Sequence, residues 1–246
     1  MHRFFVDPGQ ISGRAIRFDG DQAHQIARVL RLRADDTVIA LDGQGRQYRV
    51  RLREVTSQHA SGLIASAEDA PGEPRVRLTL YQSLLKRDKF EWVLQKATEV
   101  GVATFAPVIT RRSLPRDADD VSPEREARWN RIIKEAAEQS GRALLPELRR
   151  PVSFAAALAE AARLDAAILA YEGAAAAGLG DALRRRGDTE RLGLFIGPEG
   201  GFDPSEVAEA EAAAVMVVTL GPRILRTETA AVVAAALALD ALGEMG

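Results

Sequence analysis

Residues 195–207 read FIGPEGGFDPSEV, and this stretch decides how the second part of the chain must fold. An apolar run ends at Ile196, and three glycines and one proline follow within five residues. Asp203 followed by Pro204 is the pattern of a helix start, with a capping side chain and then proline in the first turn. Strand, tight turn and helix in this order are typical of a βα unit of a parallel sheet. Because ligands bind at the carboxyl ends of such strands, the turn is a candidate binding loop.

The residues of this loop argue against a phosphate ligand. A phosphate loop has the pattern GxxxxGKS or GxxxxGKT, and GPEGGF has neither the lysine nor the hydroxyl. The dinucleotide pattern GxGxxG does not match the spacing either. Glu199 lies inside the loop and would repel a phosphate, whereas a carboxylate and free amides suit a neutral or cationic ligand with hydrogen-bonding edges. The alternative is a purely structural turn, in which Asp203 caps the following helix.

A second strand end repeats the pattern. Residues 219–230 read TLGPRILRTETA, so a glycine and a proline again follow an apolar strand and precede a helix that begins near Thr227. Arg223, Arg226 and Glu228 lie around this turn. The structural alternative makes the arginines surface charges and Thr227 a helix cap. Two turns of this kind with ionisable residues are more than chain reversal requires, which favours a binding site.

Outward from these turns, the second part of the chain alternates between strands and helices. Strands are expected at 76–82, 103–110, 164–171, 191–197 and 215–221, and helices at 86–101, 122–141, 203–213 and from Thr227 onward. Ser122 and Gly141 have the residue types that begin and end a helix. Continuous rather than alternating apolar runs are typical of a parallel sheet that is buried on both faces. A third ionisable strand end, LAYEG at 169–173, is therefore expected beside the other two.

The first seventy residues follow a different pattern, with short strands around one helix. Strands are expected at 4–7, 14–18, 36–43, 46–55 and 60–69. Gly43 and Gly45 supply the turn of a hairpin between two of them. Residues 21–32 predict one helix, capped by Asp21. Many short strands with a single helix indicate a small β-barrel.

A linker separates the two patterns. Residues 70–75 read APGEPR, with two prolines, one glycine and no periodicity. We therefore expect two domains, a small β-rich domain over residues 1–72 and an α/β domain over residues 73–246.

The composition excludes several kinds of chemistry. The chain has no cysteine, so disulfides, thiolate metal sites and cysteine nucleophiles are excluded. Its three histidines, His2, His24 and His59, all lie in the first quarter, so the later strand ends offer neither a histidine triad nor a zinc site. No apolar run approaches the roughly 20 residues of a membrane span, and the first residues lack the apolar core of a signal peptide. We expect a soluble, cytoplasmic protein with no metal and no membrane partner.

The charges are unevenly divided along the chain. Residues 75–112 carry eight basic and three acidic side chains, whereas residues 151–246 carry seven basic and fourteen acidic ones. One interpretation is a solvated mixed surface. The other is a basic face for a polyanion on an otherwise acidic body.

The two glycine–proline motifs together resemble a known family. GPEGGF followed by LGPRILRTETA is similar to the C-terminal signature of SPOUT-class RNA methyltransferases, and more narrowly of the RsmE family, which forms 3-methyluridine in 16S ribosomal RNA. Further resemblance lies in MHRFFV, HQIARVLRLRADD, KRDKFEWVLQKATEVG, TRRS and EAAEQSGR, in the same order along the chain. The resemblance therefore covers nearly the whole sequence.

The resemblance implies a fold, a cofactor and an assembly. It implies a PUA-like N-terminal domain for RNA, a C-terminal domain with a deep trefoil knot, S-adenosylmethionine as cofactor, and a homodimer. No periodicity reveals a knot, and general topology rules disfavour one. By family position the cofactor pocket comprises Ile196, Gly197, Gly201, Leu220, Gly221, Ile224, Leu225 and Thr227. The implied partner is 16S ribosomal RNA in the small subunit, rather than DNA.

The chemistry of such a reaction selects residues near these motifs. Uridine N3 carries a proton and must lose it before it can attack a methyl group, and charge then develops on the ring. We expect Arg226 to stabilise that charge, and Glu199 to position the base or to accept the proton, with Glu228 as the other candidate base. Alternatively, water takes the proton, or Glu199 only caps amides of its own loop.

Basic residues outside the knot are the expected RNA contacts. These are Arg3, Arg28, Arg31, Lys86, Arg111, Arg112 and Arg142. Arg28 and Arg31 are three residues apart and should share one helix face. Two alternative functions stay open, a non-catalytic RNA-binding protein of ribosome assembly and a SPOUT methyltransferase that acts on transfer RNA. Cofactor binding followed by methyl transfer to small-subunit RNA separates them.

Overall fold

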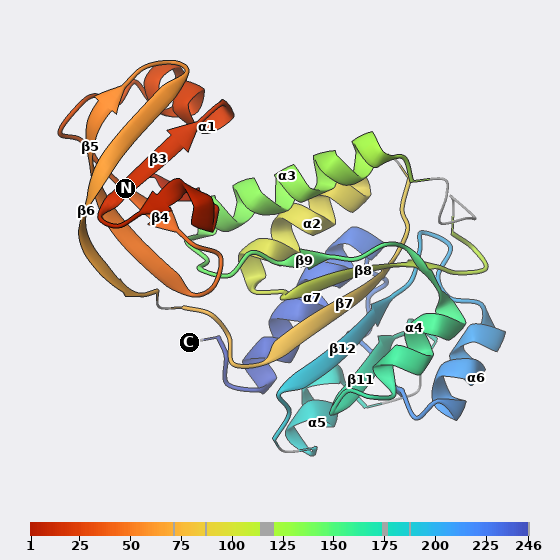
Figure 1. Cartoon of the computed structure of the whole chain (residues 1–246). Coiled ribbons are helices and arrows are strands. Elements are labelled where there is room, and N and C mark those ends of the chain that lie inside the picture. The colour runs from red at the N-terminus through yellow and green to blue at the C-terminus, as the bar shows by residue number, and fades with distance from the viewer. Residues whose placement is uncertain (71, 87, 114–120, 174–176, 187, 246) are drawn as a thin grey trace. The chain divides into compact units, whose positions relative to one another are not determined.

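The computed structural model contains two compact units (Figure 1). It describes the whole chain apart from residues 71, 87, 114–120, 174–176, 187 and 246. The first unit consists of residues 1–73 together with 137–145, and the second of residues 74–136 and 146–246. Nothing in the linker at 70–75 indicates that a segment from the middle of the chain joins the first unit.

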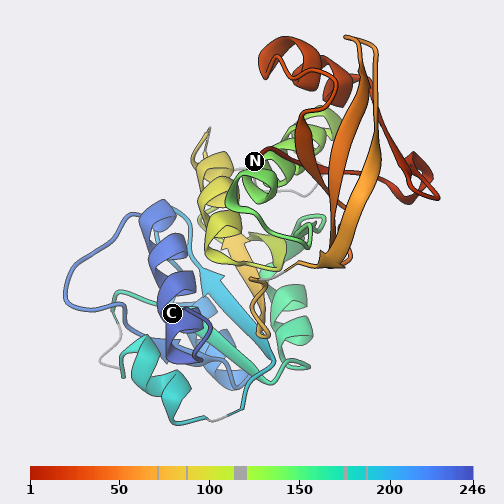
Figure 2. The same cartoon turned by 90° about the vertical axis from the view of Figure 1, so that its left-hand side faces the viewer.

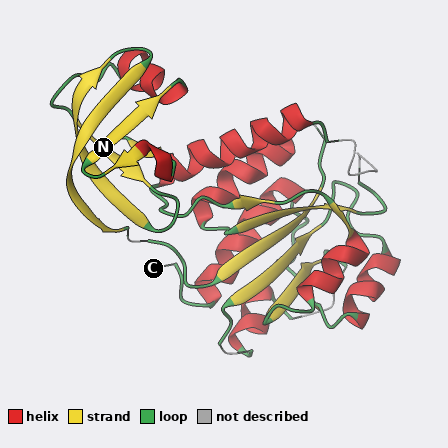
Figure 3. Ribbon diagram, viewed as in Figure 1, coloured by secondary structure: helices red, strands yellow, loops and turns green. Residues whose placement is uncertain are grey.

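The first unit is built on a six-stranded sheet, drawn as curved yellow arrows in Figure 3. Its strands are β1 (Arg3–Phe5), β2 (Ile11–Ser12), β3 (Ala15–Asp19), β4 (Thr37–Leu41), β5 (Arg46–Val55) and β6 (His59–Asp69), in the order β1-β4-β5-β6-β3-β2. All neighbours are antiparallel except β1 and β4. Alternate residues such as Ile16 and Phe18 point inward and form a core with residues of the other strands. All five expected strands are thus confirmed, and the hairpin turn has Gly43 and Gly45 at positive φ.

The helix expected over residues 21–32 is shorter and irregular. It consists of α1 (Asp21–His24) and a wide π-type turn, η2 (Gln25–Val29). Gly20 rather than Asp21 occupies the cap position, because its φ of 55° and ψ of −123° suit only glycine. Arg31 has a φ of 55°, so the chain turns away before it, and the expectation that Arg28 and Arg31 share one helix face is wrong. A short 3-10 turn, η1 (Pro8–Gln10), precedes β2.

The second unit is built on a parallel sheet, as its apolar runs predict. The strands are β7 (Arg77–Ser83), β8 (Thr104–Ile109), β9 (Glu147–Leu148), β10 (Val152–Ser153), β11 (Ala166–Ala170), β12 (Arg191–Ile196) and β13 (Met216–Val218). Their order is β10-β8-β7-β12-β11-β13, with β9 also paired to β8, and every pair is parallel. All five expected strands are confirmed, and β12, which carries the opening stretch, lies in the middle of the sheet.

Helices cover both faces of this sheet. The larger core packs against α2 (Lys89–Val100), α3 (Pro123–Ser140), α5 (Leu179–Arg184) and α7 (Thr227–Ala241), and the smaller core against α4 (Phe154–Ala161) and α6 (Pro204–Ala212). Within β12, Leu194 contributes to the first core and Phe195 to the second, so consecutive residues face opposite layers. Figure 2 shows α2 and α7, which contact each other, on the same side of the strands.

The helix ends follow the local sequence. The Ser122 hydroxyl accepts the Arg125 N–H at 3.3 Å, and Gly141 follows α3 with a φ of 81°. Asp203 caps α6 through the Ser205 N–H, with Pro204 in the first turn. The last helix begins at Thr227, so these predicted ends are confirmed.

The chain takes an indirect course between β13 and α7. It leaves β13 at one edge of the sheet and returns to place α7 against the central strands β7 and β12. The knot implied by the family resemblance concerns this threading and stays a prediction.

Candidate functional site

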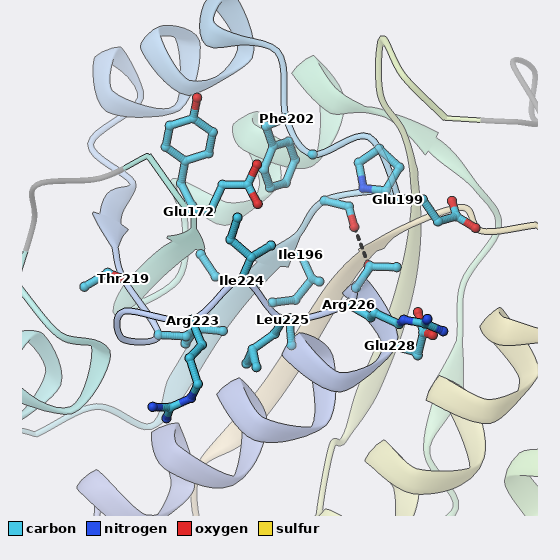
Figure 4. A pocket seen from close by; sticks show the side chains of 18 of the residues that line it. Glu172, Ile196, Glu199, Phe202, Thr219, Arg223, Ile224, Leu225, Arg226 and Glu228 are labelled. Atoms are coloured by element: carbon cyan, nitrogen blue, oxygen red, sulfur yellow. Dashed lines mark hydrogen bonds between the residues drawn. The ribbon is translucent and has the colours of Figure 1, made fainter.

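A cavity of about 380 Å³ lies at the carboxyl ends of β11, β12 and β13 (Figure 4). Three segments form its walls: residues 170–172, 196–202 and 219–228. The eight residues expected to hold a cofactor all line it, namely Ile196, Gly197, Gly201, Leu220, Gly221, Ile224, Leu225 and Thr227. Arg226 and Glu199 line it as well. The structure therefore brings together in one cavity the strand ends that the sequence predicts to meet.

The first wall, residues 197–203, is held by hydrogen bonds from inside and outside the loop. The Gly201 N–H donates to the Pro198 carbonyl at 2.9 Å, and Gly201 has a φ of 67°, a conformation that favours glycine. The Arg112 guanidinium donates to the Gly200 carbonyl at 2.9 Å and to the Asp203 carboxylate at 3.1 Å. These hydrogen bonds restrain the shape of the loop.

Thr227 joins the first wall to the start of α7. Its hydroxyl donates to the Gly197 carbonyl at 2.5 Å, the dashed line in Figure 4, and accepts the Gln82 amide at 3.3 Å. Thr227 is buried, and Arg226 occupies the cap position of the helix. The alternative in which Thr227 caps α7 is therefore wrong, because its hydroxyl contacts the neighbouring strand end instead.

The second wall, residues 219–226, is more exposed. The Thr219 hydroxyl and the backbone of Gly221 bond each other at 3.2 and 3.3 Å, and Gly221 has a φ of 109°. Beyond that turn, Ile224 is 80% exposed, and Arg226 is exposed as well. An apolar side chain in water at the edge of a cavity is available to cover a ligand.

A lysine and two glutamates form the rim of the cavity. Lys89 Nζ lies 3.4 Å from Glu199 Oε1 and 3.9 Å from Glu228 Oε2. The Lys86 N–H also donates to Glu199 Oε1 at 3.3 Å. Glu228 Oε2 is buried and accepts no hydrogen bond from any described residue. Sequence reasoning missed Lys89 as a cavity residue, because only the fold brings the start of α2 to this rim.

The third wall adds another carboxylate. Tyr171 and Glu172 follow β11, as the LAYEG motif predicts, and both line the cavity. Figure 4 shows Glu172 with Phe202 across the cavity from Arg226 and Glu228. The lining as a whole is balanced in charge, because Lys89, Arg223 and Arg226 line the cavity together with the three glutamates, so it suits a ligand that carries charges of both signs. The carboxylates nearest the glycine-rich loop, Glu172 and Glu199, agree with the objection to phosphate that the loop residues raise.

The residues expected to contact RNA are dispersed. Arg28 and Arg31 are exposed in the first unit, and Lys86 is exposed beside the cavity. In the turn after β8, the side chains of Arg111 and Arg112 are bound to acidic residues, Glu209 and Asp203 respectively. The Arg3 guanidinium lies against the backbone of Gly141, so close that a Cβ added to Gly141 would come within 3.1 Å of Arg3 Cζ, and Arg3 is only partly exposed.

Arg142 does not lie on the surface. It is 7% exposed, and its guanidinium donates to Glu73 Oε2 at 2.8 Å. Glu73 Oε1 accepts the N–H groups of Ala143 and Leu144 at 2.8 and 3.0 Å. Burial alone raises the pKa of Glu73, but the hydrogen bonds from Arg142 and Leu144 outweigh it and hold the pKa below its usual value. This placement corrects the interpretation of Arg142 as an exposed RNA contact, since its charge is used to fix 142–144 to residue 73.

The described part of the chain offers neither a membrane-spanning helix nor a metal-binding cluster. No helix there is long and apolar enough to cross a membrane. Within the same residues, no three acidic or histidine side chains are grouped so that they could hold a metal ion.

Two family models match the chain. The model described as an RNA methyltransferase domain matches residues 72–239. The model described as an RNA methyltransferase PUA domain matches residues 18–64. The first match contains all three walls of the cavity, and the second lies in the six-stranded unit.

The chain is similar to named proteins over nearly its full length. It is 31% identical to ribosomal RNA small subunit methyltransferase E of Bacillus subtilis, with 94% of this chain and 93% of the relative covered. It is 33% identical to the protein of the same name from Synechocystis, with 96% and 76% covered. A crystal structure of ribosomal RNA small subunit methyltransferase E from Neisseria gonorrhoeae, bound to S-adenosyl methionine, superposes with a TM-score of 0.87 at 32% identity and covers 98% of this chain and 97% of that one.

Proposed function

Because this chain belongs to the family of ribosomal RNA small subunit methyltransferase E, we propose that it transfers a methyl group from S-adenosylmethionine to RNA of the small ribosomal subunit. The observation that carries the proposal is the cavity itself. Both glycine–proline loops meet there, and its walls carry side chains of both charges. A pure RNA-binding protein has no need of such a cavity, so the non-catalytic alternative is not favoured.

The residues of the cavity fit S-adenosylmethionine. The cofactor supplies an electrophilic methyl group on a positively charged sulfur and carries no phosphate. Glu172 and Glu228 provide negative charge on opposite sides of the cavity. Backbone groups of the two glycine-rich walls would hold the adenine and ribose, and Ile196, Leu220 and Leu225 supply apolar contact. We also propose that the chain segments that form these walls are threaded into the trefoil knot that the family resemblance implies.

The target atom in the proposal is N3 of a uridine. When the N3–H bond breaks, its electron pair forms the new bond to the methyl carbon, and the electron pair of the old carbon–sulfur bond stays on sulfur. Negative charge develops on the uracil oxygens, and the exposed Arg226 guanidinium on the cavity wall is suited to stabilise it. An arginine beside carboxylates thus fits a nitrogen that must lose a proton before it reacts.

The contacts favour Glu228 over Glu199 as the acceptor of that proton. Glu199 already accepts the Lys86 N–H and pairs with Lys89. Glu228 Oε2 lies farther from Lys89 Nζ, at 3.9 Å, and is buried at the cavity without a hydrogen bond from the described residues, which is costly unless a ligand supplies a donor. We assign the donor to the uridine N3–H, with Glu199 fixing Lys89 beside it.

A homodimer is part of the proposal, and α7 supports it. The helix is apolar all round, so burial against the sheet does not use its whole surface. Val232, Val233 and Ala236 are only partly buried, and Leu237 is 42% exposed. Sedimentation should give twice the mass of one chain, and Leu237→Glu should shift it to one. A wild-type chain that sediments as a monomer at micromolar concentration removes the dimer from the proposal.

Three measurements test the main proposal. Calorimetry should show binding of S-adenosylmethionine to the full chain, and labelled methyl groups should appear in small-subunit RNA. Mass-spectrometric mapping of ribosomal RNA from a strain without this protein should reveal one unmethylated uridine. No binding heat and no transfer would reject the proposal, and transfer to transfer RNA alone would replace its substrate.

A further inference from the structure

Arg112 has a different environment from that predicted for an RNA contact. Its Nη1 donates to the Gly200 carbonyl at 2.9 Å and lies 3.5 Å from the Phe202 carbonyl. Its Nη2 donates to Asp203 Oδ2 at 3.1 Å. One guanidinium thus holds the carbonyl side of the first wall and the residue that caps α6.

We propose that Arg112 is a positioning residue of the cofactor cavity, which holds the first wall in the shape that binds S-adenosylmethionine. The inference rests on the proposed function. Loop 197–203 has three glycines and no strand partner beyond Ile196, so its own residues restrict it weakly. Fixing the loop before binding reduces the entropy that the ligand must offset.

The backbone around Arg112 is fixed to α6, which makes it a rigid support. Glu206 is 2% exposed, and its two oxygens accept the Arg111 N–H at 2.8 Å and the Asp203 N–H at 2.9 Å. The hydroxyls of Thr110 and Ser113 lie 2.7 Å apart, and both side chains are buried. The turn after β8 and the end of the first wall therefore form one hydrogen-bonded body.

Arginine is the residue type that this position needs. The guanidinium is planar and donates in a fork, so it reaches a carbonyl and a carboxylate at once. A lysine carries the same charge but has one compact ammonium without that fork. Arg112→Lys consequently separates a role in RNA binding from a role in positioning the loop. It retains the positive charge for RNA and loses the paired hydrogen bonds to Gly200 and Asp203.

The neighbouring Arg111 offers a matched control. Its guanidinium pairs with Glu209 at 3.2 Å on α6 and makes no hydrogen bond to residues 197–203. Its side chain is 60% exposed, against 45% for Arg112, and it belongs to the same TRRS motif. Arg111→Lys is the same substitution at the neighbouring position, where the side chain does not hold loop 197–203.

The experiment compares Arg112→Lys, Arg112→Ala and Arg111→Lys in the full chain. Calorimetry with S-adenosylmethionine should show about tenfold weaker binding for both Arg112 variants, the size expected for one or two lost charge-assisted hydrogen bonds. Arg111→Lys should bind like the wild type. In methyl transfer, the KM for S-adenosylmethionine of Arg112→Lys should rise while kcat at saturation stays close to that of the wild type. Binding of small-subunit RNA by Arg112→Lys should stay unchanged.

Two results would overturn the inference. One is wild-type cofactor affinity in Arg112→Lys, and the other is a loss of RNA binding in that variant at unchanged cofactor affinity. Thermal unfolding of each variant guards against misfolding, and Arg112→Lys at wild-type Tm decides the question even if Arg112→Ala does not fold. A wild-type chain that binds no S-adenosylmethionine rejects the proposed function instead, so the two failures are distinguishable.

Discussion

The two glycine–proline loops of the cavity look alike in sequence and are held in different ways. Loop 197–203 receives hydrogen bonds from Arg112, from the Lys86 N–H and from Thr227, and it ends in the cap of α6. In loop 219–226, residues 222–225 make no hydrogen bond to any residue that the structure describes. One wall is therefore fixed before a ligand arrives, and the other is restrained mainly at its two ends.

The difference indicates a division of work between the walls. A fixed wall binds a ligand without further loss of entropy, whereas a loosely held wall can close over the ligand and bring charged groups to it. The charge that Arg226 carries lies on the loose wall, and the paired Glu199 lies on the fixed one. Reactivity should therefore be most sensitive to residues of loop 219–226 and its helix, and cavity shape to residues that hold loop 197–203.

The largest effect should come from Arg226. Arg226→Ala removes the positive charge on the loose wall, and kcat for methyl transfer should fall by about 100-fold to 1,000-fold, as for loss of one preorganised donor in other enzymes. Thermal stability should not change, because Arg226 is exposed and forms no ion pair with a described residue. Single-turnover transfer measures the effect. A variant with wild-type kcat would remove Arg226 from the chemistry.

Substitution of the two rim glutamates, Glu228 and Glu199, should reduce kcat by different amounts. Glu228→Gln removes the carboxylate that accepts no hydrogen bond from the described residues, so kcat should fall by about 100-fold, a size typical of general-base loss. Glu199→Gln keeps a hydrogen-bond acceptor for the Lys86 N–H and should cost less than about tenfold. The ratio of the two rates is the measurement. Equal losses, or a larger loss in Glu199→Gln, would reverse the assignment of roles.

Thr227 tests the connection between the walls. Thr227→Val deletes the hydroxyl that bonds the Gly197 carbonyl and the Gln82 amide and leaves both partners in a buried site. The free energy of unfolding should drop by about 1–3 kcal/mol. Urea denaturation gives that value, and Thr229→Val, the same change two residues along α7 at a partly buried position, serves as the control. A drop no larger than the control's would show that the two walls do not depend on this bond.

The smallest effect should be a pH dependence at the end of the fixed wall. Hydrogen bonds from Ser205, with the nearby charge of Arg112, lower the pKa of Asp203. A lowered pKa stabilises the folded state above the unfolded value of about 3.9, and that stabilisation is lost as the pH falls through the folded value. The Tm difference between wild type and Asp203→Asn should be greatest near pH 7 and should shrink below pH 4. A difference that is constant with pH contradicts this.

Local features of the fold could be predicted from sequence because they depend on neighbouring residues. Asp203 and Pro204 begin a helix, Gly141 ends one, and the apolar runs form the strands of a parallel sheet. The cavity was predictable for the same reason, since parallel strands end at one edge of the sheet. Local pattern failed at residues 21–32, where glycine at the cap and a wide turn replace a regular helix.

Features that depend on distant residues could not be predicted. The residues around Arg142 in the sequence predict an exposed charge that could contact RNA. Its burial is explained only by Glu73, which the fold brings to it. Arg112 pairs with Asp203, and Lys89 reaches Glu228, across about ninety and about 140 residues. The sequence shows which residues are charged, but the fold decides which opposite charge each of them contacts.

The position of segment 137–145 in the first unit limits how the two units can be recombined between related proteins. Ala137 packs with Phe5, Ile39 and Leu41 of the first unit, and Glu138 accepts the Phe5 N–H at 2.8 Å. A genetic exchange at residue 72 would give the first unit a foreign nine-residue piece of its own core, because that piece is encoded inside the second unit's gene segment. A functional chimera between relatives therefore needs three crossovers, near residues 73, 136 and 145, rather than one.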